Sequence, residues 1–309
     1  MNKKSSLYKV FAIVLGCLSL QVYSQQRPQY TQYMYNTMTV NPGYTGSLGT
    51  LYALGAYRSQ WTGIDGAPVS QNLSVHSPLG DEKIGLGLNL INETLGPASQ
   101  VFADLNASYS IRVSQTAQLG FGLKAGIKLL NVDFSKGTYL DPNDPLLSQN
   151  IDNKVNPTVG AGAYLYSDKW YVGLSVPDFI SDKFFDEGSN SVAKEEMQFY
   201  LIGGYVFDLS TELKFKPAVL AQYSQNLPMT VDFSANFLIR ERLVLGAAYR
   251  YNDAISGLAG FYLNESFFLG YSYDYTTSEF TNYTKGSHEI ILTYTLPSKG
   301  KSVYSPRFF

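Results

Sequence analysis

Apolar and polar residues alternate with a period of two along most of the chain. From Val101 to Val113 the odd positions carry Val, Ala, Leu, Tyr or Ile, whereas the even positions are mostly polar. The same alternation recurs from Leu119 to Leu129 and from Val231 to Ile239. A period of two indicates β-strands with one apolar and one polar face, and no helical period of comparable length appears.

About fourteen segments of this kind follow one another, and several exceed the five or six residues usual in soluble strands. Nine to eleven alternating residues are enough for a tilted strand to cross a bilayer. The approximate ranges of the segments are 50–58, 70–77, 84–92, 100–113, 118–133, 157–166, 170–177, 198–207, 212–223, 229–239, 243–251, 254–263, 266–275 and 287–296.

The connections between these segments alternate in length. Those that follow even-numbered segments are tight, whereas the long ones, near 134–155, 178–197 and 276–286, all follow odd-numbered segments. Short periplasmic turns and longer outer loops are typical of outer-membrane barrels. The sequence therefore predicts an all-β fold, a transmembrane antiparallel β-barrel over residues 50–296. A soluble β-sandwich or propeller would also alternate, but it needs no regular succession of short and long connections.

The amino-acid composition excludes several other classes of protein. Only 16% of the residues are charged, against about 25% in a typical soluble domain. The net charge of −2 argues against a nucleic-acid binder that relies on a basic surface. Beyond the N-terminus no run of about 18 apolar residues occurs, which excludes a helical membrane protein. One Cys and two His exclude a disulfide scaffold and a Cys/His zinc site, and no cofactor is expected.

The N-terminus has the pattern of an export signal. Lysines precede an apolar stretch from Val10 to Leu20, and Val22-Tyr23-Ser24 then offers tolerated residues at a cleavage site. We therefore expect residues 1–24 to be a signal peptide. The alternative is lipidation of Cys17, although Leu15 is a poor residue just before Gly16. Cleavage after Ser24 would leave a mature chain without Cys, which suits an oxidising compartment.

Residues 25–49 are the least barrel-like part of the expected mature chain. Gln29–Asn36 is polar and aromatic, and Asn41–Gly46 is typical of consecutive turns. This N-terminal segment is either a flexible periplasmic leader or a folded plug, and its Tyr and Met content favours packing against something. Residues 297–309 are expected to form a short periplasmic tail.

Residues that suggest catalysis or phosphate binding are few. His76 and His288 are isolated, and neither belongs to a Ser/His/Asp arrangement legible from spacing. Gly120-x-Gly122-x-x-x-Gly126 superficially resembles a phosphate loop, but it lies inside a predicted strand. We therefore interpret these glycines as small residues that face the barrel lumen.

One acidic cluster lies in the first long connection. Asp141, Asn143, Asp144 and Asp152 carry the oxygen ligands that calcium prefers, but their spacing misses the EF-hand pattern. A cluster of turn-forming residues is the better interpretation, and no metal site is predicted.

Charged residues on the polar faces of the strands should point into the lumen. They form either a structural network that fills the interior or a lining that holds a plug or a partner segment. The predicted lumen network comprises Asp104, Arg112, Lys124, Lys128, Asp232, Arg250, Asp274 and Glu289.

Several pieces of the chain resemble one protein family, the PorP/SprF outer-membrane proteins associated with the type IX secretion system and gliding motility. The matching pieces span the whole mature chain. They are Gln29–Asn36 with Asn41–Gly46, residues 57–61 with 66–68, residues 85–87 through 96–97, Pro157–Pro177, and Ser305–Phe309.

The resemblance implies a non-enzymatic outer-membrane protein that binds, helps export or anchors a large type IX-secreted surface adhesin. It also implies contact with a periplasmic type IX adaptor that has a peptidoglycan-binding domain, and with outer-membrane lipid. As anchors for a partner we expect Tyr30, Tyr33, Tyr35 and Trp61, because buried aromatic residues dominate interface energies. The alternative for these four residues is packing in the core or the plug.

Two other functions stay open. In a passive pore or small-molecule channel, Lys124 and Lys128 would set a weak anion preference. In a barrel enzyme that acts on lipid, His76 and His288 would be the only histidine bases.

Overall fold

The computed structural model describes residues 28–80, 83–137, 150–180, 197–225 and 227–297, which form one antiparallel sheet around a short N-terminal segment. The predicted signal peptide and most of the C-terminal tail lie outside these residues. The strands are β1 (Tyr52–Ser59), β2 (Val69–Leu79), β3 (Ile84–Leu95), β4 (Ala98–Arg112), β5 (Ala117–Val132), β6 (Ile151–Ser167), β7 (Trp170–Val176), β8 (Gln198–Tyr205), β9 (Phe207–Asp208), β10 (Leu213–Ser224), β11 (Thr230–Ile239), β12 (Leu243–Arg250), β13 (Ala254–Tyr262), β14 (Phe267–Thr276) and β15 (Ser287–Thr295).

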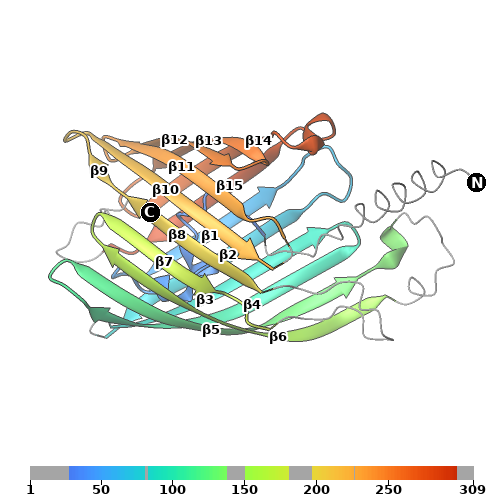
Figure 1. Cartoon of the computed structure of the whole chain (residues 1–309), viewed down its shortest axis with the longest axis horizontal. Helices are drawn as coiled ribbons and strands as arrows, with labels where there is room; N and C mark the ends of the chain where they lie inside the picture. The colour runs from blue at the N-terminus through green and yellow to red at the C-terminus, as the bar shows by residue number, and fades with distance from the viewer. Residues whose placement is uncertain (1–27, 81–82, 138–149, 181–196, 226, 298–309) are drawn as a thin grey trace, which may run out of the picture. The chain divides into compact units, whose positions relative to one another are not determined.

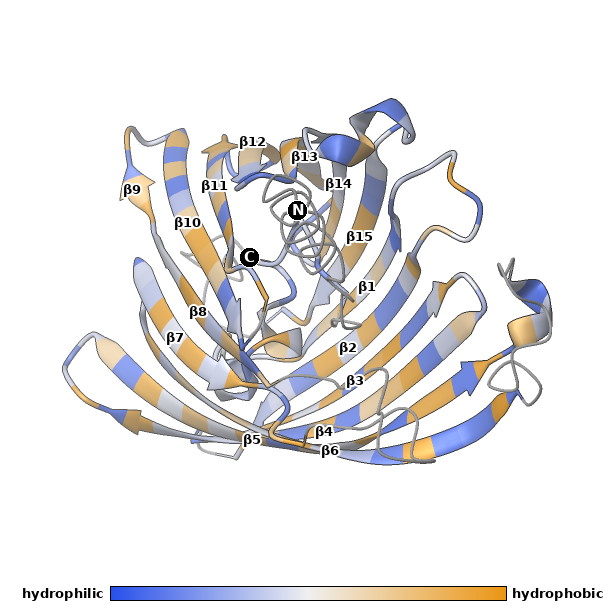
Figure 2. Ribbon diagram, turned by 45° about the vertical axis from the view of Figure 1, so that its right-hand side comes forward, coloured by the Kyte–Doolittle hydropathy of each residue, from blue (hydrophilic) through white to orange (hydrophobic). Residues whose placement is uncertain are grey.

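The sheet closes on itself (Figures 1 and 2). Each strand pairs with its neighbours in sequence, β1 pairs with β15, and the short β9 continues β8 along the edge of β10. The result is a closed barrel of 14 antiparallel strands, which confirms the predicted fold. Among the described strands, closure leaves no free sheet edge of the kind that would pair with other chains.

The two ends of the barrel differ. At one end, the turn end, the connections 80–83, 113–116, 168–169, 209–212, 240–242 and 263–266 are each at most four residues long. The opposite end, the loop end, carries the longest connections, 133–150 and 177–197, together with 60–68 and 277–286. β1 begins at the turn end, and so do the other odd-numbered strands up to β7.

Strand positions agree with the predicted segments within a few residues, except at β6. This strand begins at Ile151 rather than near residue 157, and its pairing with β5 shifts register between Leu130 and Val132. Three consecutive polar residues and Pro157 interrupt the apolar alternation there, so the sequence pattern did not indicate the first residues of β6. Backbone pairing with β5 nevertheless continues through them.

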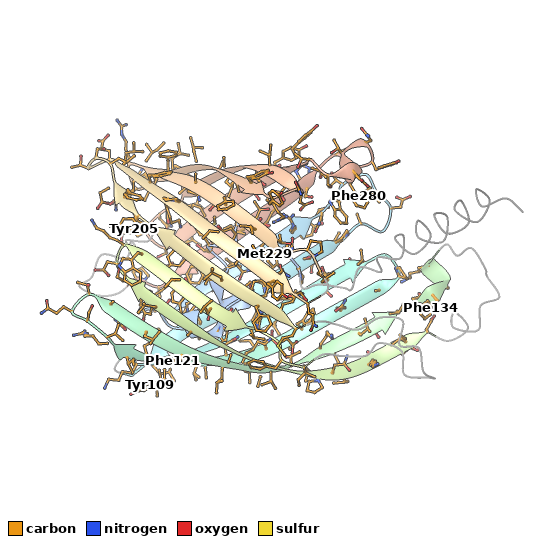
Figure 3. All side chains as sticks on the ribbon, in the orientation of Figure 1. Tyr109, Phe121, Phe134, Tyr205, Met229 and Phe280 are labelled. Atoms are coloured by element: carbon orange, nitrogen blue, oxygen red, sulfur yellow. The ribbon has the colours of Figure 1, made fainter. Side chains whose placement is uncertain are left out.

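The wall has an apolar outer face. Outward side chains such as Leu105 and Leu123 remain 66% and 67% exposed, whereas their neighbours Asp104 and Lys124 are buried inside. Figure 2 shows the resulting alternation of colours along the strands, and Figure 3 shows side chains projecting from the wall, including Tyr109 and Phe121. An apolar exterior around a polar interior is the pattern of a barrel surrounded by lipid. No helix in the described ranges is long and apolar enough to span a membrane.

Candidate functional site: the lumen and its plug

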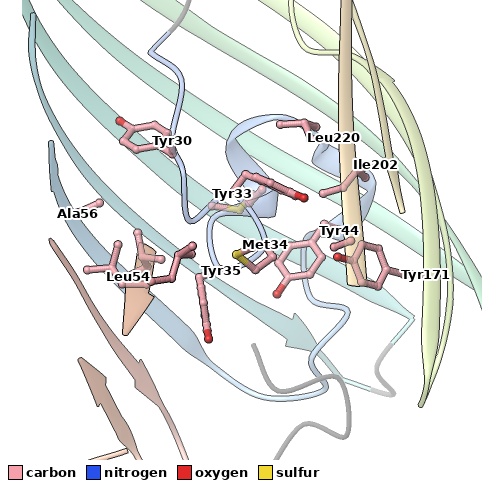
Figure 4. Packing of buried hydrophobic residues seen from close by; sticks show 14 of the residues in the cluster. Tyr30, Tyr33, Met34, Tyr35, Tyr44, Leu54, Ala56, Tyr171, Ile202 and Leu220 are labelled. Carbon is pink, nitrogen blue, oxygen red and sulfur yellow. The ribbon is translucent and has the colours of Figure 1, made fainter. Parts of the chain in front are cut away.

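The lumen contains the N-terminal segment. Residues 28–50, here called the plug segment, form the short 3-10 helices η1 (Thr37–Thr39) and η2 (Pro42–Tyr44) before the chain enters β1. From Tyr30 to Ser47 every residue except Val40 is buried. Figure 4 shows its aromatic side chains lying among residues of the barrel wall. The plug segment, which lacks the alternating pattern of a strand, therefore occupies the barrel interior as a folded element.

Asn41 fixes the start of η2 and ties it to the wall. Its Oδ1 accepts a hydrogen bond of 2.8 Å from the backbone N–H of Gly43, and its Nδ2 donates to the carbonyl of Ala163 on β6 at 3.1 Å. Ser175 on β7 donates a further hydrogen bond of 2.7 Å to the carbonyl of Val40. The backbone of the plug segment is thus hydrogen-bonded to the wall it lies against.

Glycines in the wall make room for this backbone. A Cβ on Gly122 of β5 would collide with the backbone of η2, and a Cβ on Gly120 would lie 2.5 Å from the carbonyl oxygen of Gly43. A Cβ on Gly87 of β3 would lie 2.6 Å from the sulfur of Met38. Gly120 and Gly122 therefore form a groove for the plug segment, whereas Gly126 of the same motif lies against Ala103 and Asp104 of β4.

The aromatic residues of the plug segment pack inside the barrel. Tyr35 stacks on Phe268 of β14 with ring centroids 4.8 Å apart, and the ammonium of Lys216 lies 5.4 Å from the Tyr35 centroid. The Tyr33 hydroxyl lies within hydrogen-bonding distance, 3.2 Å, of Ser234 on β11. Tyr30 is 6% exposed. A partner would reach these tyrosines only if the segment left the lumen.

A charged cluster at the loop end holds the upstream part of the plug segment. Arg58 of β1 pairs with Asp274 of β14 at 2.7 Å and with Glu289 of β15 at 3.1 Å, and we call these three residues the loop-end cluster. The two carboxylate oxygens of Glu289 accept the backbone N–H groups of Thr31 and Gln32, both at 2.9 Å. Charge-assisted bonds in a buried site of this kind are among the stronger hydrogen bonds in proteins.

The structure divides the predicted lumen network into separate groups. Asp104 pairs with Lys124 at 3.5 Å, and Arg250 pairs with Asp232 at 2.7 Å. Asp274 and Glu289 meet through Arg58, as described above. Lys128 is also fully buried.

Arg112 departs from the predicted network. It is the last residue of β4 and is exposed beside the 113–116 turn. The alternation continues to Arg112 in sequence, but the enclosed lumen ends before it.

The sequence reasoning missed Arg58 and Lys216, which are both buried in the lumen. Arg58 has the same parity as Tyr52, Leu54 and Ala56, so alternation placed all four on one face. That face contains apolar residues because it packs against the tyrosines of the plug segment. An inner face that packs against protein need not be polar. Because the inner face of β1 is largely apolar, the alternation did not indicate that Arg58 faces the lumen.

The two histidines occupy different environments. His76 lies on the inner face of β2, where its Nδ1 accepts a hydrogen bond of 3.2 Å from the backbone N–H of Gly46. His288 lies near the loop end of β15, with its Nδ1 2.7 Å from the hydroxyl of Tyr271 on β14.

The described residues contain no group of three or more metal-binding side chains. Of the acidic cluster, Asp152 is exposed, and residues 141, 143 and 144 lie outside the described ranges.

Trp61 lies apart from the tyrosines, in the connection that follows β1. Its ring stacks on Phe280 of the 277–286 connection with centroids 5.1 Å apart and planes 12° apart. Backbone hydrogen bonds of 2.8 Å from Thr62 to Gly286 and of 2.7 Å from Lys285 to Thr62 join the two connections. Phe280 remains 48% exposed. We call Trp61 and Phe280 the loop-end platform.

Trp61 adopts a φ of +49°, in the left-handed region that bulky residues rarely occupy. Its backbone N–H donates a hydrogen bond of 3.0 Å to Ser287 Oγ, which helps to hold this conformation. Strain maintained by surrounding contacts is a feature of many functional sites. The loop-end platform is therefore a preformed aromatic surface.

Comparisons with known proteins identify a family. Residues 22–294 match the family described as the type IX secretion system membrane protein PorP/SprF. None of the curated proteins matches the sequence.

Among solved structures, Omp33 of Acinetobacter baumannii aligns over 80% of this chain and 98% of its own, with 5% identity and a TM-score of 0.47. A TodX deltaS2S3 mutant, a monoaromatic hydrocarbon channel, aligns over 80% and 90%, with 10% identity and a TM-score of 0.49. At these identities the likeness concerns the fold alone.

Proposed function

The chain belongs to the PorP/SprF family of type IX secretion system membrane proteins and is an outer-membrane β-barrel, as its sequence predicted. From this premise we propose that it is a plugged, non-enzymatic barrel that holds a large type IX-secreted surface adhesin at the cell surface. In this proposal the turn end faces the periplasm, where it meets a type IX adaptor with a peptidoglycan-binding domain, and the loop end faces outward.

The observation that carries the proposal is the filled lumen. The plug segment is buried along most of its length, and buried charges around it are paired between nearby strands of the wall. A wall packed against its own plug is a rigid frame for the loops rather than a water-filled channel. This supports a binding role over the passive pore.

The loop-end platform supports an outward-facing partner. Stacked aromatic residues supply large contact areas at low conformational cost, and Trp is enriched among the residues that dominate interface energies. Trp61 therefore remains the proposed partner anchor, whereas Tyr30, Tyr33 and Tyr35 are assigned to the plug.

Mild-detergent purification of the tagged protein from its native outer membrane, followed by mass spectrometry, tests the proposal. We expect one very large secreted protein to co-purify. Recovery of the barrel alone, under conditions that keep other envelope complexes intact, would contradict the proposal.

A matched pair of variants tests the platform separately. Trp61→Ala should reduce the recovered partner by about 30-fold, equivalent to a hot-spot loss of about 2 kcal/mol. Tyr251→Ala removes an exposed aromatic residue elsewhere at the loop end, next to the end of β12, and should leave recovery unchanged. Equal recovery with both variants would reject the platform while leaving the partner itself established.

A further inference from the structure

The plug segment crosses the lumen in a definite direction. Its downstream part lies at the turn end, because a Cβ on Gly46 would lie 2.7 Å from the Cα of Gly85 and 3.4 Å from that of Pro78, two residues near the turn between β2 and β3. Its upstream part lies at the loop end, because Thr31 is bound to Asp274 and Glu289 beside the 277–286 connection.

A second contact gives the same direction. Gln29 Nε2 donates a hydrogen bond of 3.2 Å to Oε1 of Gln222, two residues before β10 ends at the loop end. Gln29 and Pro28 are half-buried rather than buried, unlike Tyr30 and the residues that follow it. The chain therefore runs from the loop end to the turn end and then reverses into β1.

The length of the chain upstream of Pro28 is then decisive. Cleavage after Ser24 would leave three residues, 25–27, before Pro28. Three extended residues span at most about 10 Å, whereas the apolar band of an outer-membrane barrel is about 25 Å tall. Such a chain cannot return through the lumen to the periplasmic end.

We infer that the mature N-terminal end of the protein is presented at the outer mouth of the barrel, on the cell surface, where it adjoins the surface available to a secreted partner. The loop-end cluster holds it there through Thr31 and Gln32. The same strands position the loop-end platform, since Trp61 follows β1 by two residues and its N–H bonds to Ser287 of β15. Contact with the partner rests on the proposed function, whereas the location rests on the orientation with the turn end in the periplasm, which is typical of outer-membrane barrels.

Single cysteines in the full chain test the location. The only Cys of the sequence, Cys17, lies in the predicted signal peptide, so an introduced Cys would be unique in the mature protein. A short Gly/Ser insertion that carries one Cys is placed between Gln26 and Arg27. Intact cells are treated with a membrane-impermeant maleimide, and heat-modifiable migration verifies that the barrel is folded.

Two substitutions calibrate the labelling. Tyr283→Cys marks the outer face, where Tyr283 is 74% exposed, and Gln115→Cys marks the exposed turn between β4 and β5. The inserted Cys should react on intact cells within about twofold of Tyr283→Cys, whereas Gln115→Cys should react only after permeabilisation. Labelling of the inserted Cys only after permeabilisation or unfolding would overturn the inference. Gln29→Cys repeats the test without an insertion and is expected to give the same pattern.

Two further measurements complete the test. Mass spectrometry of the mature protein should show Gln25 as the first residue; a lipidated Cys17 would leave enough chain to reach the periplasm and would overturn the inference. Labelling of the inserted Cys should also increase at least threefold in cells that lack the co-purifying partner. Equal labelling with and without the partner would reject the partner contact, while surface labelling would still establish the location.

Discussion

Substitution of Gly122 by alanine tests whether the wall is shaped around the plug segment. The added Cβ would meet the carbonyl group of Pro42 and the nitrogen of Gly43, which are backbone atoms of η2. No flexible side chain can move aside, so η2 must shift. Gly257 on β13 is the matched control, because a Cβ there would meet nothing within 4 Å.

Only the Gly122 variant should lose stability. Overpacking costs about 1–3 kcal/mol, whereas a tolerated Gly→Ala change stabilises by about 0.4–1 kcal/mol by restricting the unfolded chain. We therefore expect Gly122→Ala to lower the free energy of unfolding by about 1–2 kcal/mol and Gly257→Ala to leave it equal or slightly raised. Urea titration in lipid vesicles, followed by heat-modifiable migration, measures both. Equal effects of the two substitutions would refute the claim that the glycine groove is built for the plug segment.

Substitutions at three further positions probe other contacts of the plug segment, each measured by the same urea titration. Arg58→Ala should cost about 3–5 kcal/mol, because it leaves two buried carboxylates without their cation; Arg58→Lys should restore part of this loss. Asn41→Ala should cost about 1–3 kcal/mol through its lost wall and cap hydrogen bonds. Phe268→Ala should cost about 3–5 kcal/mol, because it opens a cavity beside Tyr35. Any of the three alanine variants within about 0.5 kcal/mol of the unchanged protein would reject the corresponding contact.

Much of the barrel could be predicted because each strand separates lipid from lumen. That separation forces a period of two, so parity alone placed Asp104, Lys124 and Asp232 inside. Connection lengths added an independent signal for the two ends. The start of β6 was misplaced, because pairing with β5 continues through a polar stretch that carries no alternation.

The plug was harder to predict, because its contacts are distant in sequence. Thr31 binds Glu289 across 258 positions, and Asn41 binds Ala163 across 122. No local period marks such contacts, so the tyrosine content suggested packing but neither its place nor its direction. Arg58 was missed for a related reason, since the inner face of β1 is apolar where it meets the plug segment.

The central claim is that the barrel is closed by its own N-terminal segment. The most direct test is the conductance of the purified protein in a planar bilayer. The intact protein should insert without steady channel currents. Deletion of residues 29–46, with folding verified by heat-modifiable migration, should produce an open channel and show that insertion is detectable. A steady open channel from the intact protein would contradict the account and favour a passive pore.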